Sequence, residues 1–236
     1  MRRENVPPSY VLIAAGVLGL TACSESVPPG GGPDVEPISD AKESVAIRIA
    51  TDGTGNCNFD ALAVDRYVAA LNNTDYANGT MCGACAEVEG PSGQKVVVRI
   101  VDSCAGCTGN QIGMSEQAFD TMGAQGQVQA PIKWRYVSCQ VEGPVQYRFK
   151  EDSNEYWVAI QVRNHRLPIQ KLEWEKSGTW VEVARQPYNY FVEPAGMGPG
   201  PVHVRVTATD GQQLEDTLPQ VIQATIVVGA AQFKKP

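Results

Sequence analysis

The chain has 236 residues, a formal net charge of −7 and two histidines, His165 and His203. A negative net charge argues against electrostatic binding of nucleic acid or of an anionic wall polymer. Both histidines lie in strand-like sequence and are too few for a histidine-based metal centre. We therefore interpret them as structural, and we expect neither a metal nor a cofactor.

The N-terminus has the pattern of an export signal. Arg2 and Arg3 precede the apolar run "YVLIAAGVLGL", which is too short to span a bilayer comfortably as a permanent helix. The run ends in "LTACS", which resembles the lipobox of bacterial lipoproteins and would make Cys23 the lipidated first residue. We predict a lipoprotein signal peptide over residues 1–22, with an ordinary secretory signal as the alternative. Ser24 favours the outer membrane, so we expect an exported, outer-membrane-anchored or extracellular protein.

A tether is predicted next, over residues 23–44. The stretch "SESVPPGGGPDVEPISDAKES" is rich in Pro, Gly and acids and has no apolar period, which is typical of an extended linker. The body that follows exceeds the commonest single-domain size. Its cysteines all lie between positions 57 and 139. We therefore divide it into domains at residues 45–143 and 144–236.

The first domain mixes strands with small helices. The strands are "SVAIRIAT", "KVVVRIVD" and "PIKWRYVS", and the helix-like stretches are "DALAVDRYVAALN" and "SEQAFDTMG". Ser115 is the predicted N-cap of the second helix.

The cysteines indicate disulfides. With Cys23 assigned to lipid, six remain, and an even number in an oxidising compartment predicts three bridges. The pairs "CGAC" and "CAGC" leave a zinc site as the alternative, because four thiolates suit zinc.

The second domain is all β by pattern. "YWVAIQVRN", "KLEWEK", "TWVEVAR", "VHVRVTATD" and "ATIVVG" alternate apolar and polar residues and are separated by turn signals. Short strands with regular turns predict a sandwich, and about 90 residues can supply its core without disulfides.

These segments together resemble an expansin of the bacterial type. The resemblance rests on "EVEGPSGQKVVVRIVD", "IKWRYV", "YWVAIQVRNHRLP" and "LEWEKSGTWVEV", with "YNYF" further on. It implies a mainly β protein, in which a six-stranded double-psi β-barrel with small helices is followed by an Ig-like β-sandwich. It also implies a non-hydrolytic monomer that binds cellulose and loosens wall contacts. By analogy with the plant and fungal branches, the disulfides are Cys57–Cys82, Cys85–Cys139 and Cys104–Cys107.

The resemblance also assigns a polysaccharide groove on the barrel. Its threonine matches Thr51 and its central aspartate matches Asp102, whereas the second aspartate, at the entry to a helix, is replaced by Gly113. Glycoside hydrolysis usually needs two carboxyl groups. The other acids nearby are interpreted as solvated charges: Asp52, Glu116 and Asp120. We therefore expect no hydrolytic activity and no catalytic residue.

Three aromatic residues of the second domain match the cellulose-binding row of the family: Tyr156, Trp157 and Tyr188. Aromatic planes bury the flat C–H faces of sugar rings without using charge. Alternation places Val158, Ile160 and Val162 in the core, and leaves Trp157, Ala159 and Gln161 on the other face. Exposure of Tyr156 then requires a strand start or bulge. The alternative is that all three aromatics are core residues. Trp134, Trp174 and Trp180 are interpreted separately, as packing residues of the barrel or of hairpins.

Three functions remain open at this point. The first is a non-catalytic wall protein that binds cellulose or a related β-1,4-glucan, with peptidoglycan as another candidate partner. Its loosening activity would be weakened by Gly113. The second is a lytic transglycosylase or endoglucanase that uses the barrel groove. The third is a surface adhesion lipoprotein.

Overall fold

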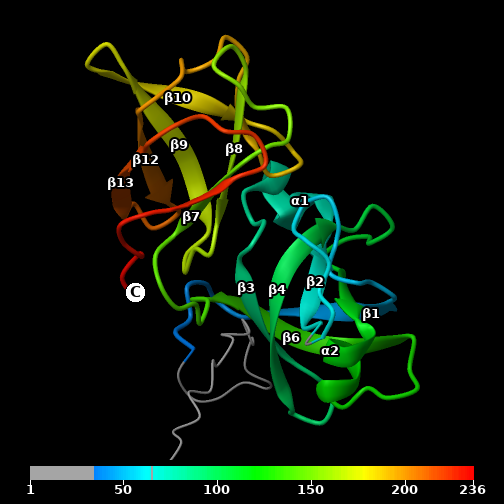
Figure 1. Ribbon diagram of the computed structural model, residues 1–236. Helices are drawn as coiled ribbons and strands as arrows, with labels where there is room; N and C mark the ends of the chain where they lie inside the picture. Colours follow the sequence, from blue (N-terminus) through cyan, green and yellow to red (C-terminus); the bar gives the residue numbers. More distant parts are fainter. Residues whose placement is uncertain (1–34, 65) are drawn as a thin grey trace, which may run out of the picture.

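The structure is a computed structural model that describes residues 35–64 and 66–236. These residues form two β-rich bodies that lie against each other (Figure 1). The predicted signal peptide, Cys23 and most of the predicted tether lie outside the described residues. Within the described ranges, no helix is both long and apolar enough to cross a membrane.

The first body is a closed six-stranded barrel, as predicted. Its strands are β1 (Lys42–Ile49), β2 (Val68–Leu71), β3 (Cys85–Glu89), β4 (Lys95–Ser103), β5 (Ile112–Ser115) and β6 (Gln129–Val137). They follow the order β1-β5-β2-β4-β3-β6, and β1 closes the barrel by pairing parallel to β5 and antiparallel to β6. Trp134, Ile100 and Met114 fill the interior.

The predicted helix over "DALAVDRYVAALN" is wrong. Its last apolar residues form β2, which pairs with β4 on one side and β5 on the other. All four residues of β2 are buried. A short apolar run of this kind cannot be assigned to a strand or a buried helix from periodicity alone, and here the two neighbouring strands supply the backbone hydrogen bonds.

The helices of the barrel are short. They are α1 (Asn73–Tyr76), the 3-10 helix η1 (Ala77–Gly79) and α2 (Glu116–Thr121). Ser115 caps α2 as predicted, because its hydroxyl accepts from the Ala118 amide at 3.4 Å.

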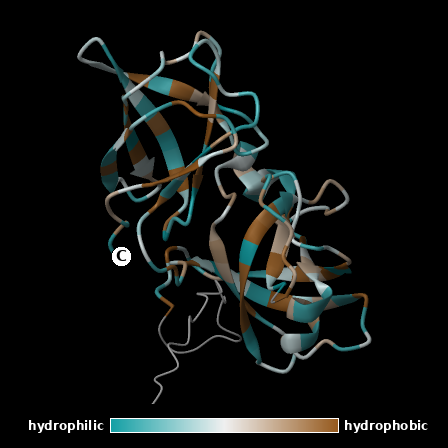
Figure 2. Ribbon diagram, in the orientation of Figure 1, coloured by the Kyte–Doolittle hydropathy of each residue, from teal (hydrophilic) through white to brown (hydrophobic). Residues whose placement is uncertain are grey.

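The second body is a sandwich of eight strands. They are β7 (Gln146–Phe149), β8 (Val158–Arg163), β9 (Ile169–Lys176), β10 (Thr179–Arg185), β11 (Phe191–Glu193), β12 (Val202–Ala208), β13 (Gln213–Leu218) and β14 (Ile226–Val228). The hydrogen-bonded order is β13-β12-β9-β10-β11-β8-β7-β14. One apolar cluster joins Phe149 and Ile160 to Leu172 and Val204, so the series folds over a single core. Brown and teal segments alternate along several of these strands (Figure 2).

The three disulfides pair the cysteines that the resemblance implies. The bridges are Cys57–Cys82, Cys85–Cys139 and Cys104–Cys107. The two cysteines of "CGAC" therefore join different partners, whereas those of "CAGC" join each other. All six cysteines among the described residues are bridged, so none of these is left as a thiolate for the zinc alternative.

The ordered body begins before the predicted tether ends. β1 starts at Lys42, and residues 35–39 run along the end of β6. The Ile38 amide donates to the Tyr136 carbonyl at 3.0 Å, and the Ser138 amide donates to the Glu36 carbonyl at 2.8 Å. Ile38 also packs against the sandwich core cluster. The tether boundary at residue 44 is therefore wrong, because this segment pairs with the barrel and contacts both bodies.

We predict that a chain starting at residue 45 is less stable than one starting at residue 35. The shorter chain loses the first β1 residues and the hydrogen bonds along β6. At about 1 kcal/mol for each of several lost bonds, its thermal midpoint should fall by about 10 °C. Scanning calorimetry of both chains measures the difference. Equal midpoints would show that residues 35–44 behave as a tether.

Candidate functional site

Two of the candidate groove positions, on the strands that flank β2, lie in one row across the barrel. Ala70 of β2 pairs with Asp102 of β4 on one side and with Gly113 of β5 on the other. The structure therefore brings Asp102 and Gly113 together with a single small residue between them. Two strand spacings separate their Cα atoms by roughly 10 Å.

Asp102 is fixed by the loop that follows β1. Its Oδ1 accepts from the Asn56 amide at 2.6 Å and from the Ser103 amide at 2.8 Å. Gly55 approaches so closely that a Cβ there would lie 2.5 Å from the Asp102 Cβ. Only glycine fits at position 55. The carboxylate thus has a set orientation and can accept hydrogen bonds from sugar hydroxyls.

Gly113 occupies a regular strand position. It pairs with Ile47 and Ala70, is buried, and its backbone is not left-handed. It therefore lies within β5, two residues before the N-cap of α2. A Cβ at this position would meet the Ile49 Cδ1 at 3.1 Å. A side chain there is compatible with the backbone but requires the end of Ile49 to move.

Thr51 follows β1 and lines a pocket that contains none of the residues of the row. Its Oγ1 accepts from the Gly53 amide at 3.1 Å. The pocket is lined by Thr51, Ala63, Val64, Arg66, Ser115, Glu116 and Gln117. Asp102 and Gly113 do not line this pocket, so the three candidate groove residues do not form one enclosed site.

The remaining acids near the groove have local partners. Asp52 accepts hydrogen bonds from the hydroxyl and amide of Thr54, and these lower the pKa of its carboxyl. Asp120 pairs with the Arg48 guanidinium, and Glu116 lies 3.6 Å from it. None of the three belongs to the row that contains Asp102.

The aromatic candidates lie at the surface of the sandwich. Tyr156 is 74% exposed, whereas Trp157 and Tyr188 are half-buried, and none of the three belongs to a core cluster. Tyr156 lies in the tight turn before β8, where Asn154 and Trp157 exchange backbone hydrogen bonds. This turn is the strand start that the exposure of Tyr156 requires.

A close approach of the chain supports this turn. A Cβ on Gly196 would lie 2.6 Å from the Tyr156 Cα, and the Gly198 amide donates to the Glu155 carbonyl at 3.1 Å. The left-handed backbone of Gly196 also favours glycine.

The outer face of β8 is covered by the barrel. Ala159 and Gln161 are completely buried, although alternation places them away from the sandwich core. The Gln161 Nε2 donates to the Cys57 carbonyl at 2.8 Å. Sequence periodicity detects one buried face of this strand and cannot detect a second face that another domain covers.

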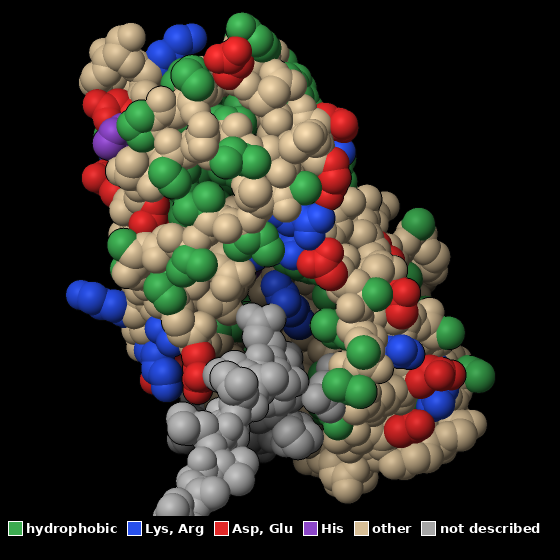
Figure 3. Space-filling view, in the orientation of Figure 1, with side chains coloured by type: hydrophobic (Ala, Val, Ile, Leu, Met, Phe, Trp, Pro, Cys, Tyr) green, Lys and Arg blue, Asp and Glu red, His purple; other side chains and the backbone are tan. Residues whose placement is uncertain are grey.

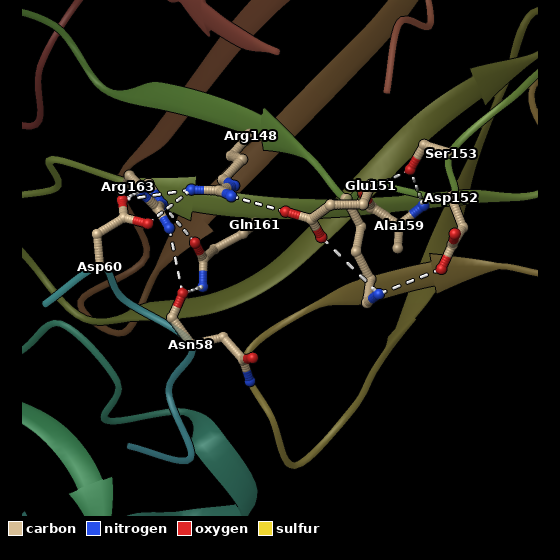
Figure 4. Close-up of polar contacts among 10 residues, drawn as sticks. Asn58, Asp60, Arg148, Glu151, Asp152, Ser153, Ala159, Gln161 and Arg163 are labelled. Atoms are coloured by element: carbon tan, nitrogen blue, oxygen red, sulfur yellow. Dashed lines mark hydrogen bonds and ion pairs between the residues drawn. The ribbon is translucent and has the colours of Figure 1, made fainter. Parts of the chain in front are cut away.

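Charged residues complete this junction. Asp60 of the barrel accepts from Arg163 and Arg148 of the sandwich, and Figure 4 shows both guanidinium groups directed at its carboxylate. Desolvation opposes ionisation of Asp60, but the two arginines outweigh it and hold the pKa of that carboxyl below its usual range. Acidic and basic side chains gather where the two bodies meet (Figure 3).

The histidines and the other tryptophans have packing roles. His165 is buried, and this burial, with added repulsion from Arg99, lowers its pKa to about 3. His203 is exposed and contacts Thr217. Trp134 and Trp174 lie in the two cores, while Trp180 stacks against the Arg205 guanidinium at 4.5 Å.

Comparison with known proteins assigns a family. No family model matches the chain. It is 35% identical over 184 residues to Expansin-YoaJ of Bacillus subtilis, covering 74% of this chain and 78% of that protein. It is 32% identical over 191 residues to Expansin-like protein 5 of Dictyostelium discoideum, covering 76% and 79%. The chain belongs to the expansin family.

Solved structures agree with this expansin assignment. The apo expansin of Clavibacter michiganensis superposes with a TM-score of 0.77 at 27% identity, covering 84% of this chain and 100% of that one. A mutant of the same protein, in complex with cellohexaose, matches with a TM-score of 0.77 at 28% identity.

Sequence reasoning missed the expansin residues that join the two domains. Asn56 and Asn58 of the barrel, and Gln161 and Asn189 of the sandwich, make hydrogen bonds across the junction. Asn58 and Asn189 both have a left-handed backbone. The signal available in the sequence was only the presence of asparagine in predicted turns, which is too general to identify an interface.

Proposed function

We propose that this protein is a non-hydrolytic expansin that binds cellulose-type β-1,4-glucan at the cell wall. The observation that carries the proposal is the exposed ring of Tyr156, which the family resemblance groups with Trp157 and Tyr188. Tyr156 is 74% exposed, so burial of its ring adds little to the stability of the fold. The exposed tyrosine ring is well suited to stack on a sugar, because an aromatic ring buries a large apolar area without needing charge. The complex of a related expansin with cellohexaose supports this substrate class.

The groove residues support binding without cleavage. Asp102 supplies one oriented carboxylate, and the position across Ala70 in the same row carries glycine. Hydrolysis with inversion or retention needs a second carboxyl group within roughly 5–9.5 Å. The nearby acids Asp52, Glu116 and Asp120 have local partners outside the row. Asp102 therefore acts as a hydrogen-bonding residue for the glycan, and wall loosening is weak.

We propose that the protein is exported and anchored to the outer membrane by an N-terminal lipid. Cys23 in "LTACS" carries the lipid, and the chain from there to Val35 reaches about 40 Å at full extension. Residues 35–39 pair with β6, and β6 lies opposite β2 in the barrel order. The groove row is centred on β2. The described chain therefore begins on the side of the barrel away from this row, and a lipid anchor attached upstream favours an outward-facing groove.

We predict that the double substitution of Trp157 and Tyr188 by Ala weakens binding to insoluble cellulose at least tenfold. Loss of two large rings removes most of the apolar contact with the sugar. The thermal midpoint should change by only about 3 °C, because neither ring is a core residue. Pull-down isotherms on cellulose, xylan and peptidoglycan measure the affinity and its selectivity.

Trp180→Ala is the matched control for this experiment. Trp180 is a half-buried aromatic on the same domain, and it stacks on Arg205 outside the proposed surface. Its substitution should leave cellulose binding unchanged. Full binding by the Trp157 and Tyr188 double variant, or preference of the native protein for peptidoglycan, would refute the proposed function.

We predict that Gly113→Asp increases creep of cell-wall strips under load. The new carboxyl would lie in the row with Asp102, on a strand position with an ordinary backbone. Its burial beside Ile49 should cost about 1–3 kcal/mol of stability. Gly113→Asn, which has the same size but no charge, controls for shape. A reducing-sugar assay on all three proteins should remain at background, and equal creep of the native and Gly113→Asp proteins would contradict the prediction.

We predict that a fatty-acid probe labels the native protein in its host and does not label Cys23→Ser. The thiol of Cys23 is the only lipid-attachment chemistry that the "LTACS" motif provides. Fractionation should place the native protein with the outer membrane and the variant in a soluble fraction. Equal labelling of the two proteins would exclude the anchor while leaving sugar binding unaffected.

A further inference from the structure

The loop that carries Tyr188 is held mainly by the other domain. This loop, residues 186–190, joins β10 to β11 in the sandwich. Four side-chain hydrogen bonds tie it to the barrel: Asn58 Nδ2 to the Tyr188 carbonyl (3.0 Å), Asn56 Nδ2 and the Tyr76 hydroxyl to the Pro187 carbonyl (3.2 and 2.6 Å), and Asn189 Nδ2 to the Cys57 carbonyl (3.1 Å). Within the sandwich, the amides of Asn189 and Gln186 make turn bonds, and the Tyr188 ring lies 6.0 Å from the Tyr190 ring.

The barrel side of this contact is firmly held. The Cys57–Cys82 disulfide links the segment 56–58 to the segment that contains Tyr76. The Cys57 carbonyl accepts two buried amides, from Gln161 and Asn189. The Asn56 amide at the same time donates to Asp102 in the groove. One short segment therefore sets both the groove carboxylate and the backbone under Tyr188.

We propose that Asn58 and Asn189 are positioning residues for sugar binding, and that they act by fixing the orientation of Tyr188. This proposal rests on the proposed function, since it concerns the same aromatic surface. An aromatic ring stacks well on a sugar only when its plane is already aligned with the chain. Ordering a mobile loop at the moment of binding would consume part of the binding free energy. In this protein the barrel orders the loop in advance.

The backbone at both positions allows a clean test. Asn58 has a φ of 52° and Asn189 a φ of 64°, a region that glycine adopts without strain. Asn58→Gly and Asn189→Gly therefore remove the side-chain amide and keep the turn. Asn164 provides a matched control. It is also left-handed, with a φ of 49°, and its Nδ2 donates to the Glu142 and Pro144 carbonyls, in the linker between the domains.

Cellulose pull-down of the whole chain should show about fivefold weaker binding for Asn58→Gly and for Asn189→Gly, as expected for one lost hydrogen bond. Asn164→Gly should bind like the native protein. When combined with Tyr188→Ala, the Asn58→Gly substitution should have no further effect, because its influence passes through Tyr188. A general loss of stability would not produce this non-additivity.

A second measurement does not depend on sugar. Amide hydrogen exchange at residues 186–190 should be faster in Asn58→Gly than in Asn164→Gly, at equal thermal midpoints. Undiminished cellulose binding by Asn58→Gly, or effects that add fully to those of Tyr188→Ala, would overturn the positioning role while leaving the proposed function intact. Absence of cellulose binding by the native protein would instead refute the proposed function, together with the inference that rests on it.

Discussion

The carbonyl oxygen of Cys57 is the point on which the arrangement of the two domains depends. It accepts side-chain amides from Gln161 and Asn189, both of which are buried. Each of these bonds contributes about 0.5–1.5 kcal/mol net, because water would replace the Cys57 carbonyl if the domains separated. The two bonds hold the barrel loop against β8. This contact also explains why a strand with one apolar face is buried on both.

The ion pairs around Asp60 lie at the rim of the junction. Asp60 remains two-thirds exposed while it accepts from Arg163 and Arg148. Pairs with so exposed a partner contribute little free energy. The junction thus combines buried neutral hydrogen bonds with a charged rim. Tyr188 and Asp102, which belong to different domains, are both placed by this junction.

The chemistry of the surface fits a neutral, extended ligand. A net charge of −7 gives no attraction for anionic polymers. Aromatic planes and one oriented carboxylate can recognise the C–H faces and hydroxyl groups of a sugar chain without any positive charge. With Gly113 in the same row as Asp102, this row carries one carboxylate, whereas glycoside hydrolysis usually uses two.

The sequence by itself determined the elements whose signals are local. These include most strands, the N-cap Ser115 and, through resemblance to the expansins, the barrel, the sandwich and the disulfide pairs. Only the tertiary structure decided the rest. The sequence pattern of β2 predicts a helix, whereas its strand identity depends on hydrogen bonds from β4 and β5. The composition of residues 35–44 predicts a tether, whereas contacts with β6 and with the sandwich hold this segment in place. The roles of Asn58, Gln161 and Asn189 could not be inferred, because each arises from a partner more than a hundred residues away in the chain.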